Sequence, residues 1–336
     1  METDNREAGS GGRMGLLLLQ TGSPDTCDLA GVRRYLRRFL MDPHVISLPF
    51  PLRALLVHGI IAPLRARKSL ELYRHIWTGQ GAPLTAHTRN LAAAIAARRP
   101  DLCVRHAAVY ASPTPGDALR DFVQEGVGEV LVLPLFPQHA TASRGAALAA
   151  VRAAAARAPH APALRELPPF YDAPWFIEPL ARLYGPLLRD FAPDRVIFSF
   201  HGLPLAQAAR DAAAGPECDY VGQCKATMDA LVGVLGLDTD RCRLGWQSRF
   251  GRGWLAPDTE SLLAAAPAGG AARVALCAPC FVADCLETLE ELGLRGRACF
   301  MAAGGRELLL LPCLNVSDDW VEAVCRRALP PPKAKN

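Results

Sequence analysis

The feature that most constrains this chain is a regular alternation of short apolar runs with longer amphipathic segments. Runs rich in Leu, Val and Ile, such as 15–20, 129–135 and 195–200, are each followed by a stretch with helical spacing. Strands that alternate with helices form parallel sheets joined by right-handed crossovers. The sequence therefore predicts an α/β fold, in which ligands bind beyond the carboxyl ends of the strands.

The alternation occurs in both halves of the chain, whose 336 residues suffice for two ordinary domains. The Pro-rich stretch 159–169 is the best candidate for a boundary between them. We expect an N-terminal α/β domain over residues 14–160 and a C-terminal α/β domain over 170–328, each a doubly wound parallel sheet. The polar, Gly-rich residues 1–13 are expected to form a disordered tail.

The individual elements follow from the period of the apolar residues. Strands are predicted at 15–20, 103–110, 129–135, 195–200, 242–246, 273–277 and 307–312. Helices are predicted at 29–40, 85–99, 115–125, 143–156, 175–191, 220–235, 258–265, 284–292 and 318–327.

Charge and cysteine content exclude some classes of protein. The net charge of +4 is small and not clustered, and no nucleic-acid-binding signature is present, so we expect no nucleic-acid partner. An odd number of cysteines, eleven, without a secretory signal fits free thiols in a reducing compartment. No apolar run is long enough to span a bilayer. These observations predict a cytoplasmic protein.

The segment 49–61 does not fit the alternation. It places apolar residues on one helical face, and Arg65, Arg67 and Lys68 follow it. The apolar residues are Leu52, Leu55, Leu56, Gly59 and Ile60. A core helix is the more frequent explanation of such a pattern. The alternative is an amphipathic lip that lies in a membrane interface, and the cations that follow favour it.

His201 lies just beyond the apolar run 195–200 and is followed by Gly202 and Pro204. Glycine allows close backbone approach and proline stiffens the turn, so the loop would present the imidazole at a strand end. Histidine exchanges protons near neutral pH and binds divalent metals. A structural histidine is the common alternative for such a position.

The second chemical feature is the acidic segment 284–291. Asp284 and Glu287 match a helix capping box, which is a purely structural explanation. Glu290 and Glu291 continue the acidic face, either as a solvated surface or as a path that brings a hydrated divalent cation to Glu287. A histidine and a carboxylate that face each other across a cleft could bind a metal, move protons, or both.

The spacing of Cys277, Cys280 and Cys285 is similar to that of iron–sulfur or zinc sites. A fourth ligand would have to come from elsewhere, with Cys218 and Cys224 as candidates. A metal bound by these three cysteines, which lie just before and within the acidic segment, would interfere with the chemistry of that segment, so we expect no cluster there. The alternative is that these cysteines serve as small apolar residues.

Two further segments carry donors and aromatic groups at strand ends. Residues 247–255 include Gln247, Ser248 and Trp254, which suit a flat, apolar, anionic ligand. Gln138 ends the run 133–138 and could face the same pocket. The structural alternative for the first segment is an ordinary strand-to-helix loop.

Taken together, these motifs resemble the ferrochelatase family, whose members insert ferrous iron into a porphyrin to make haem. The resemblance extends from residue 14 to about 327 and rests on 32–40, 133–138, 199–204, 247–251, 284–291 and 312–315, together with Phe281. It implies two Rossmann-like domains with a porphyrin cleft between them. It also implies that His201 and Glu287 face each other across the macrocycle, as catalytic residues and metal ligands.

The resemblance extends to the substrate pocket. Tyr110, Trp254 and Phe281 match pocket positions, and Ser248 matches a contact on the propionate side. Val109 stands where relatives often have arginine, and Cys280 where glycine is common. Family members with a [2Fe-2S] cluster have a cysteine in the segment 139–143 and a Cys-rich extension, and this chain has neither there. The resemblance thus implies no cofactor beyond the substrate Fe²⁺.

The apolar segment 49–61 resembles the lip of membrane-associated members that use protoporphyrin. We therefore expect protoporphyrin IX and Fe²⁺ as substrates, attachment to the inner-membrane surface on its cytoplasmic face, and contact with the preceding haem-pathway oxidase. One alternative is a chelatase for another tetrapyrrole, either coproporphyrin III or a sirohydrochlorin-type ring with iron or cobalt. Another is a non-catalytic haem-binding carrier with the same fold.

Overall fold

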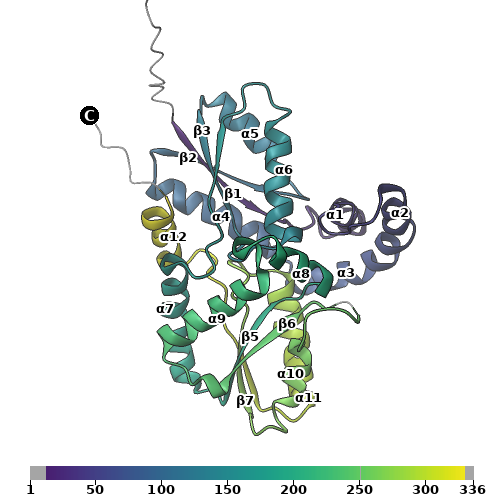
Figure 1. The fold of residues 1–336 in the computed structure, drawn as a ribbon, viewed down its shortest axis with the longest axis vertical. Helices are drawn as coiled ribbons and strands as arrows, with labels where there is room; N and C mark the ends of the chain where they lie inside the picture. Colours follow the sequence, from purple (N-terminus) through teal and green to yellow (C-terminus); the bar gives the residue numbers. More distant parts are fainter. Residues whose placement is uncertain (1–12, 250, 330–336) are drawn as a thin grey trace, which may run out of the picture.

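The computed structural model describes residues 13–249 and 251–329 and contains two four-stranded parallel sheets (Figure 1). The strand order is β2-β1-β3-β4 in the first sheet and β6-β5-β7-β8 in the second. The strands are β1 (Met14–Gln20), β2 (Leu102–Ala108), β3 (Glu129–Pro134), β4 (Ala163–Glu166), β5 (Arg195–His201), β6 (Cys242–Gln247), β7 (Arg273–Cys277) and β8 (Glu307–Leu310). The predicted α/β class with two parallel sheets is confirmed.

Helices cover both sheets. The α-helices are α1 (Leu29–Leu40), α2 (Phe50–Ala54), α3 (Ala62–Ile76), α4 (Pro83–Arg98), α5 (Pro115–Gln124), α6 (Ala146–Ala155), α7 (Pro174–Phe191), α8 (Leu205–Ala213), α9 (Tyr220–Leu235), α10 (Thr259–Ala265), α11 (Arg297–Ala302) and α12 (Asp318–Ala323). The π-helices are η1 (Leu55–Ile61), η2 (Thr141–Gly145), η5 (Glu287–Gly296) and η6 (Val324–Ala328), and short 3-10 turns are η3 (Pro216–Cys218) and η4 (Thr239–Arg241).

Strand β4, helices α3, α8 and α11, and the 3-10 turns η3 and η4 were not predicted. Strand β4 lies inside the stretch 159–169, which was expected to be a domain boundary, and pairs with β3. Its four residues are only partly buried at the edge of the sheet, so it has no apolar run to indicate a strand. The position of a boundary stays a prediction, and the tail expected over 1–13 lies outside the described residues except for Arg13.

The two sheets share one hydrophobic core. The largest buried cluster contains Leu16 and Leu131 of the first sheet, Phe198 of the second, and Trp320 of α12. Burial of apolar side chains from both halves in one cluster joins them firmly, because this is the main favourable term in folding. Arg99 adds a hydrogen bond from its guanidinium to the carbonyl of Cys325 at 3.0 Å.

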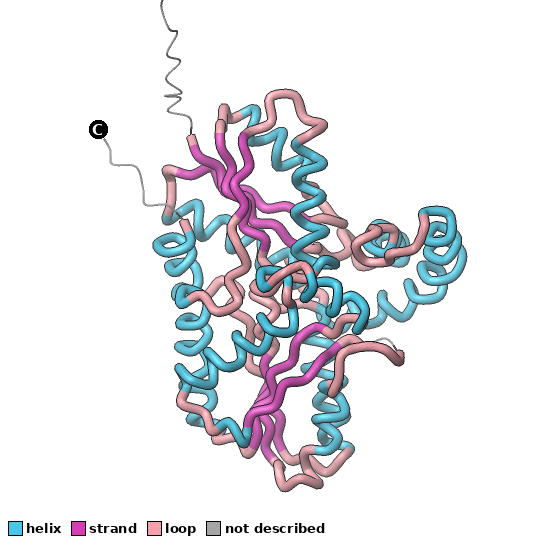
Figure 2. The backbone as a smooth tube through the Cα atoms, in the orientation of Figure 1, coloured by secondary structure: helices cyan, strands magenta, loops and turns pink. Residues whose placement is uncertain are grey.

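The carboxyl ends of both sheets face the middle of the molecule. In Figures 1 and 2 the chain enters β1 from the top and enters β5 from the bottom end of α7. The strands therefore run toward each other, and the loops that follow them meet between the two sheets. Helices α1, α2 and α3 form an arm that projects to the right of this region.

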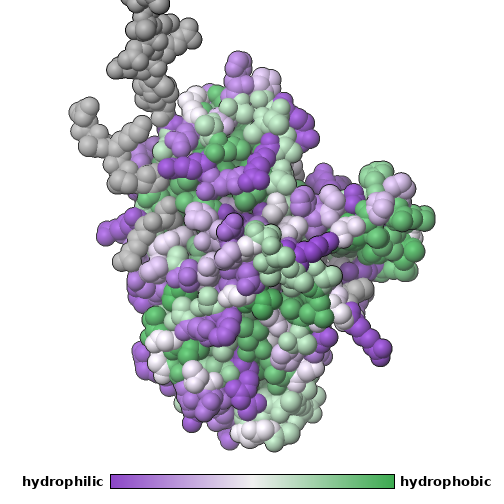
Figure 3. Space-filling view, in the orientation of Figure 1, coloured by the Kyte–Doolittle hydropathy of each residue, from purple (hydrophilic) through white to green (hydrophobic). Residues whose placement is uncertain are grey.

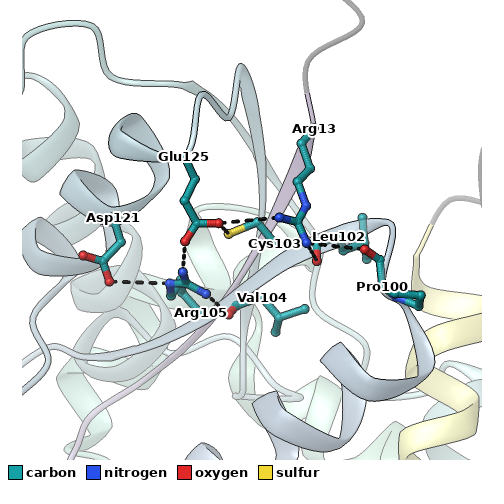
Figure 4. A network of polar contacts seen from close by, with 8 residues as sticks. All are labelled: Arg13, Pro100, Leu102, Cys103, Val104, Arg105, Asp121 and Glu125. Carbon is teal, nitrogen blue, oxygen red and sulfur yellow. Dashed lines mark hydrogen bonds and ion pairs between the residues drawn. The ribbon is translucent and has the colours of Figure 1, made fainter.

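The opposite, amino-terminal end of the first sheet carries a polar network (Figure 4). The guanidinium of Arg13 donates to the carbonyl of Leu102 at 3.3 Å and pairs with Glu125. Glu125 also pairs with Arg105 and accepts from the thiol of Cys103 at 3.0 Å. These contacts join β1 and β2 to the residue that ends α5, far from the loops where a ligand would bind.

Candidate active site

His201 is the last residue of β5 and is paired in register with Gln247 of β6. Its Nδ1 lies 2.8 Å from the carbonyl oxygen of Gly202. A carbonyl only accepts hydrogen bonds, so Nδ1 carries a hydrogen, and Nε2 is the ring nitrogen that this contact leaves open. The hydroxyl of Tyr220 donates to the backbone carbonyl of His201 at 2.8 Å. The strand end thus holds the imidazole ring in one orientation.

Gly202 is required by close backbone approach, as predicted. A Cβ at this position would lie 2.8 Å from the carbonyl oxygen of Gln247, whose oxygen already accepts the Gly202 N–H at 2.7 Å. Two further backbone bonds, Leu205 to Gly253 and Leu255 to Leu203, fasten the loop after β5 to the loop before α10. Any larger residue at 202 would push these loops apart and move His201.

The acidic segment forms the start of a π-helix, not of the predicted α-helix. Asp284 does not form a capping box with Glu287, so that explanation is wrong. Its carboxylate instead accepts from the amide of Asn315 at 2.6 Å and from the hydroxyl of Thr288 at 2.9 Å. The backbone N–H of Asp284 donates back to Asn315 at 2.8 Å. This reciprocal pair fixes the turn that precedes Glu287.

Glu291 brings the two chemical features together. Its two carboxylate oxygens accept from the backbone N–H and the hydroxyl of Ser248, both at 2.6 Å. Burial raises the pKa of Glu291, the bonds from Ser248 lower it, the charge of Glu287 raises it, and His201 lowers it. His201 and Glu287 therefore both lie within electrostatic range of the same carboxylate.

Glu290 is not part of a solvated face, and that explanation is wrong for this residue. It is 2% exposed, and its carboxylate accepts from Nε of Arg295 at 2.9 Å. Five residues separate the two, which is the spacing that a π-helix aligns. Glu290 is therefore buried and paired with a cation, and its role in a cation path stays a prediction.

Of the predicted pocket residues, Gln247 and Trp254 lie near His201, whereas Gln138 lies in a contact between the two halves. Gln247 and Trp254 lie beside His201, because Gln247 is its register partner and Trp254 bridges to Pro204. The Oε1 of Gln247 accepts from Ser199 at 2.8 Å, and the side chain is buried. Gln138 is also buried, and its amide donates to Thr227 at 2.8 Å in a contact between the halves.

The remaining candidates, Tyr110, Phe281 and Ser248, each have contacts within the protein. Tyr110 is buried, and its hydroxyl donates to Asp42 at 2.8 Å. Phe281 is partly buried against the hydrophobic cluster that contains Ile197 of β5 and Leu276 of β7. The hydroxyl of Ser248, expected on the propionate side, is donated to Glu291. Ser248 also has a positive φ of 58°, so its loop is held in a backbone conformation that few residues adopt.

Sequence reasoning missed two tyrosines near the acidic helix. Tyr35 of α1 and Tyr73 of α3 have strongly raised pKa values, first because of burial and also because of the charge of Glu287. Tyr73 belongs to a core cluster against which Leu286 and Leu289, on either side of Glu287, also pack. Tyr35 lies in the motif 32–36, but nothing in the sequence indicated Tyr73.

The cysteines near the site are free thiols. The thiols of Cys277 and Cys280 donate to the carbonyls of Ile197 and Ser199 at 3.7 and 3.8 Å. Burial raises the pKa of Cys280 to about 12. Across 13–249 and 251–329, no three His, Cys, Asp or Glu residues gather as a metal-binding group. That no cluster is bound stays a prediction.

The segment 49–61 exposes its apolar residues, so the core-helix explanation is wrong. Exposed fractions are 57% for Leu52, 69% for Leu55 and 51% for Ile60, while Leu56 is half-buried and Val57 is fully buried. Figure 3 shows this apolar surface at the tip of the projecting arm. Along the described residues, no helix combines the length and apolar character needed to cross a bilayer.

A family model described as Ferrochelatase matches residues 13–329. The chain belongs to the ferrochelatase family. The ferrochelatase of Azoarcus sp. (strain BH72) is 40% identical over 324 residues, which cover 95% of this chain and 88% of the relative. That of Azotobacter vinelandii is 39% identical over 329 residues and covers 93% of this chain and 97% of its own.

Solved structures show the same fold as this ferrochelatase family member at low identity. CbiX, described as the terminal enzyme of sirohaem biosynthesis in denitrifying bacteria, has a TM-score of 0.50 at 18% identity and covers 94% of this chain and 100% of its own. DR2241 from Deinococcus radiodurans, described as similar to chelatases, has a TM-score of 0.52 at 13% identity over 97% of this chain and 56% of its own. Both likenesses concern the fold alone.

Proposed function

We propose that this chain inserts ferrous iron into protoporphyrin IX, with His201 and Glu287 as the reacting pair. Membership of the ferrochelatase family makes it a metal-inserting enzyme of haem synthesis that acts on iron and a porphyrin. The observation that carries the assignment of residues is the position of Glu291 on η5, the helix that begins at Glu287. Glu291 accepts two bonds from Ser248, which directly follows the register partner of His201.

Insertion exchanges one Fe²⁺ for the two N–H protons of the macrocycle, so two protons must leave the site. His201 is suited to accept one, because the carbonyl of Gly202 holds its Nδ1–H and leaves Nε2 open for a proton or a metal. Glu287 and Glu291 supply carboxylates for the second proton or for the arriving metal. Because burial raises its pKa, Glu291 holds a proton more readily than an ordinary carboxylate.

The second requirement is to expose a pyrrole lone pair to the metal, because a flat macrocycle directs its lone pairs inward. Binding that bends the ring costs roughly 1–5 kcal/mol, which must come from contacts remote from the reacting nitrogens. Trp254 beside His201 and the row of aromatic rings from α1 are candidates for those contacts. Fe²⁺ also has to shed water, and the carboxylates of Glu287 and Glu291 would replace it.

The exposed apolar arm supports protoporphyrin over coproporphyrin as the substrate. Protoporphyrin has two carboxylates and is poorly soluble, so an enzyme that takes it from a membrane needs an apolar contact surface. Phe50, Leu52, Leu55 and Leu64 provide one, each more than half exposed. We therefore infer attachment of this arm to the cytoplasmic face of the inner membrane, where contact with the preceding oxidase would transfer the substrate.

The decisive experiment is anaerobic. Purified protein, Fe²⁺ and protoporphyrin IX are mixed and the visible spectrum is followed, with coproporphyrin III in a parallel reaction. We expect protohaem to form faster than the iron complex of coproporphyrin. His201→Ala should abolish insertion while porphyrin binding, followed by fluorescence quenching, survives.

Each alternative gives a different result in this assay. Faster metallation of coproporphyrin would contradict the substrate proposal. Tight porphyrin binding with no metallation above the protein-free control would make the chain a carrier. Full turnover by His201→Ala would remove His201 from the mechanism and return it to a structural role.

A further inference from the structure

A polar cluster lies at the end of α1, around Tyr110, one of the residues proposed to contact the porphyrin. The hydroxyl of Tyr110 donates to Oδ2 of Asp42 at 2.8 Å. The other oxygen, Oδ1, accepts from the backbone N–H of His44 at 2.8 Å and lies 2.8 Å from its Nδ1. Because both contacts of His44 fall on Oδ1, Oδ2 is left for Tyr110. The carboxylate cannot rotate without breaking all three contacts.

Asp42 is itself held in place by the backbone. Its N–H donates to the carbonyl of Phe39 at 3.3 Å, and its own carbonyl accepts from Val45 and Ile46 at 3.1 and 2.9 Å. These bonds continue the end of α1 into a tight turn. The position of the carboxylate is therefore fixed relative to α1.

Helix α1 also supplies the ring that contacts Tyr110. Phe39 contacts Tyr110 edge-to-face, with ring centroids 5.2 Å apart, and stacks on Tyr35 at 6.1 Å. Tyr35 in turn lies within electrostatic range of Glu287. The three rings thus form a row that leads from the acidic π-helix to Asp42, and Tyr110 is its outer member.

The cluster borders a cavity of about 350 Å³ that is separate from the His201 loop. It is lined by Arg38, Met41, Asp42, Pro43, His44, Tyr110 and four alanines of the segment 146–153. The side chain of Asp42 is 14% exposed and that of His44 is 36% exposed. A carboxylate so nearly buried needs its donors, because an unpaired buried charge is costly.

We propose that Asp42 and His44 are positioning residues that hold the Tyr110 ring for the porphyrin. The inference rests on the proposed function, in which Tyr110 contacts the macrocycle. His44 fixes the carboxylate, the carboxylate fixes the phenol, and the phenol fixes the rotation of the ring against Phe39. Bonds to a charged acceptor are stronger than neutral ones, so this anchor is stiffer than a neutral partner would give.

The expected consequence is a change in turnover more than in binding. The macrocycle would still be covered if the Tyr110 ring turned, but the wall against which it bends would move. Small displacements of positioning groups reduce the rate of the chemical step strongly. We therefore expect kcat to fall and the KM for porphyrin to change little.

The test measures kcat and KM for protoporphyrin in His44→Ala, His44→Gln, Asp42→Asn, Tyr110→Phe and the double variant Asp42→Asn/Tyr110→Phe. We expect His44→Ala to lower kcat about three- to tenfold, the loss that one hydrogen bond represents. His44→Gln should restore much of it, because a glutamine amide can donate to Oδ1. The double variant should be no slower than Asp42→Asn alone, because both changes break one interaction.

Asp117→Asn is the matched control. Asp117 also accepts two bonds from a neighbour, the N–H and hydroxyl of Thr114, but it caps α5. The variant Asp117→Asn should lower the thermal midpoint of unfolding without changing kcat. Equal kcat in His44→Ala and the parent, or additive losses in the double variant, would overturn the inference alone. A parent protein that metallates no porphyrin would overturn the proposed function and this inference with it.

Discussion

Two π-helices of this protein differ in which kind of residue they expose and which kind they bury. Helix η1 (Leu55–Ile61) exposes apolar residues, with Leu55 69% and Ile60 51% exposed. Helix η5 (Glu287–Gly296) buries charge, with Glu290 only 2% exposed. Both pack on the same cluster, to which η1 contributes Val57 and against which Leu289 of η5 packs.

The difference shows that neither helix is arranged for stability alone. Burial ordinarily favours apolar residues inside and charges outside. Helix η1 departs from this rule because it exposes apolar side chains, and η5 departs from it because it buries a carboxylate. Both helices pack on the same hydrophobic cluster. π-helices are frequent at functional sites because the extra residue in each turn re-aims side chains. This contrast fits the proposals that η1 contacts a membrane and that η5 carries the chemistry.

The largest effect is expected at the first residue of η5. Glu287→Gln keeps the size of the side chain but removes its charge and its capacity to take up a proton. Insertion should slow by about 100-fold or more, which is the usual contribution of an acid–base group. Anaerobic initial rates measure this. Glu260→Gln, an exposed carboxylate in the same half, should stay within about twofold of the parent. Similar rates in both variants would contradict the role of Glu287.

The next effect concerns the stability of η5. Arg295→Gln leaves the buried carboxylate of Glu290 without its cation and should lower the free energy of unfolding by about 1–3 kcal/mol. Denaturant titration measures the change. The double variant Glu290→Gln/Arg295→Gln should recover part of the loss, since a neutral amide costs less to bury. An unchanged unfolding midpoint would mean that Glu290 has another partner or is protonated.

A matched pair of substitutions on η1 separates its two faces. Leu55→Glu should weaken sedimentation with phospholipid vesicles by about tenfold or more, because burying one leucine contributes about 1.5–3 kcal/mol. Its thermal midpoint should not change. Val57→Ala should show the reverse, with vesicle binding retained and stability lowered by about 1–2 kcal/mol. If Leu55→Glu sediments like the parent protein, η1 does not contact the membrane.

The smallest effect is the pH dependence of Glu291. Its pKa is raised in the folded protein, so the folded state binds a proton more tightly than the unfolded chain does. The contribution of Glu291 to stability is therefore highest below its unfolded pKa and falls as pH rises toward the folded pKa. Glu291→Gln should flatten this part of the stability curve, measured by denaturant titrations between pH 4 and 8. A parallel curve would show that another group titrates there.

Much of the fold could be predicted because it depends on local patterns. The bounds of α1, α9 and β7 were predicted to the residue, since apolar periodicity and capping side chains such as Asp28 and Asp219 mark them. Strand β4 could not be predicted, because its four partly exposed residues are held in the sheet only by pairing with β3.

The site was predictable in kind but not in its contacts. His201 at a strand end and Glu287 at a helix start are visible in the sequence. The partners of the other residues are not, because they come from distant segments, as Ser248 does for Glu291 and Asn315 for Asp284. The π geometry of η5 also cannot be seen in the pattern, since its backbone hydrogen bonds span five residues instead of the four of an α-helix.

The sequence by itself determined the α/β class, most of the elements and the chemical character of the site. These depend on periodicity and on residue type, which are local properties. Only the tertiary structure decided which charges are buried and which apolar residues face outward. Leu55 and Val57 are two residues apart and equally apolar, yet one is 69% exposed and the other fully buried. Their difference comes from the neighbours that the fold brings to each, and no short stretch of sequence contains those neighbours.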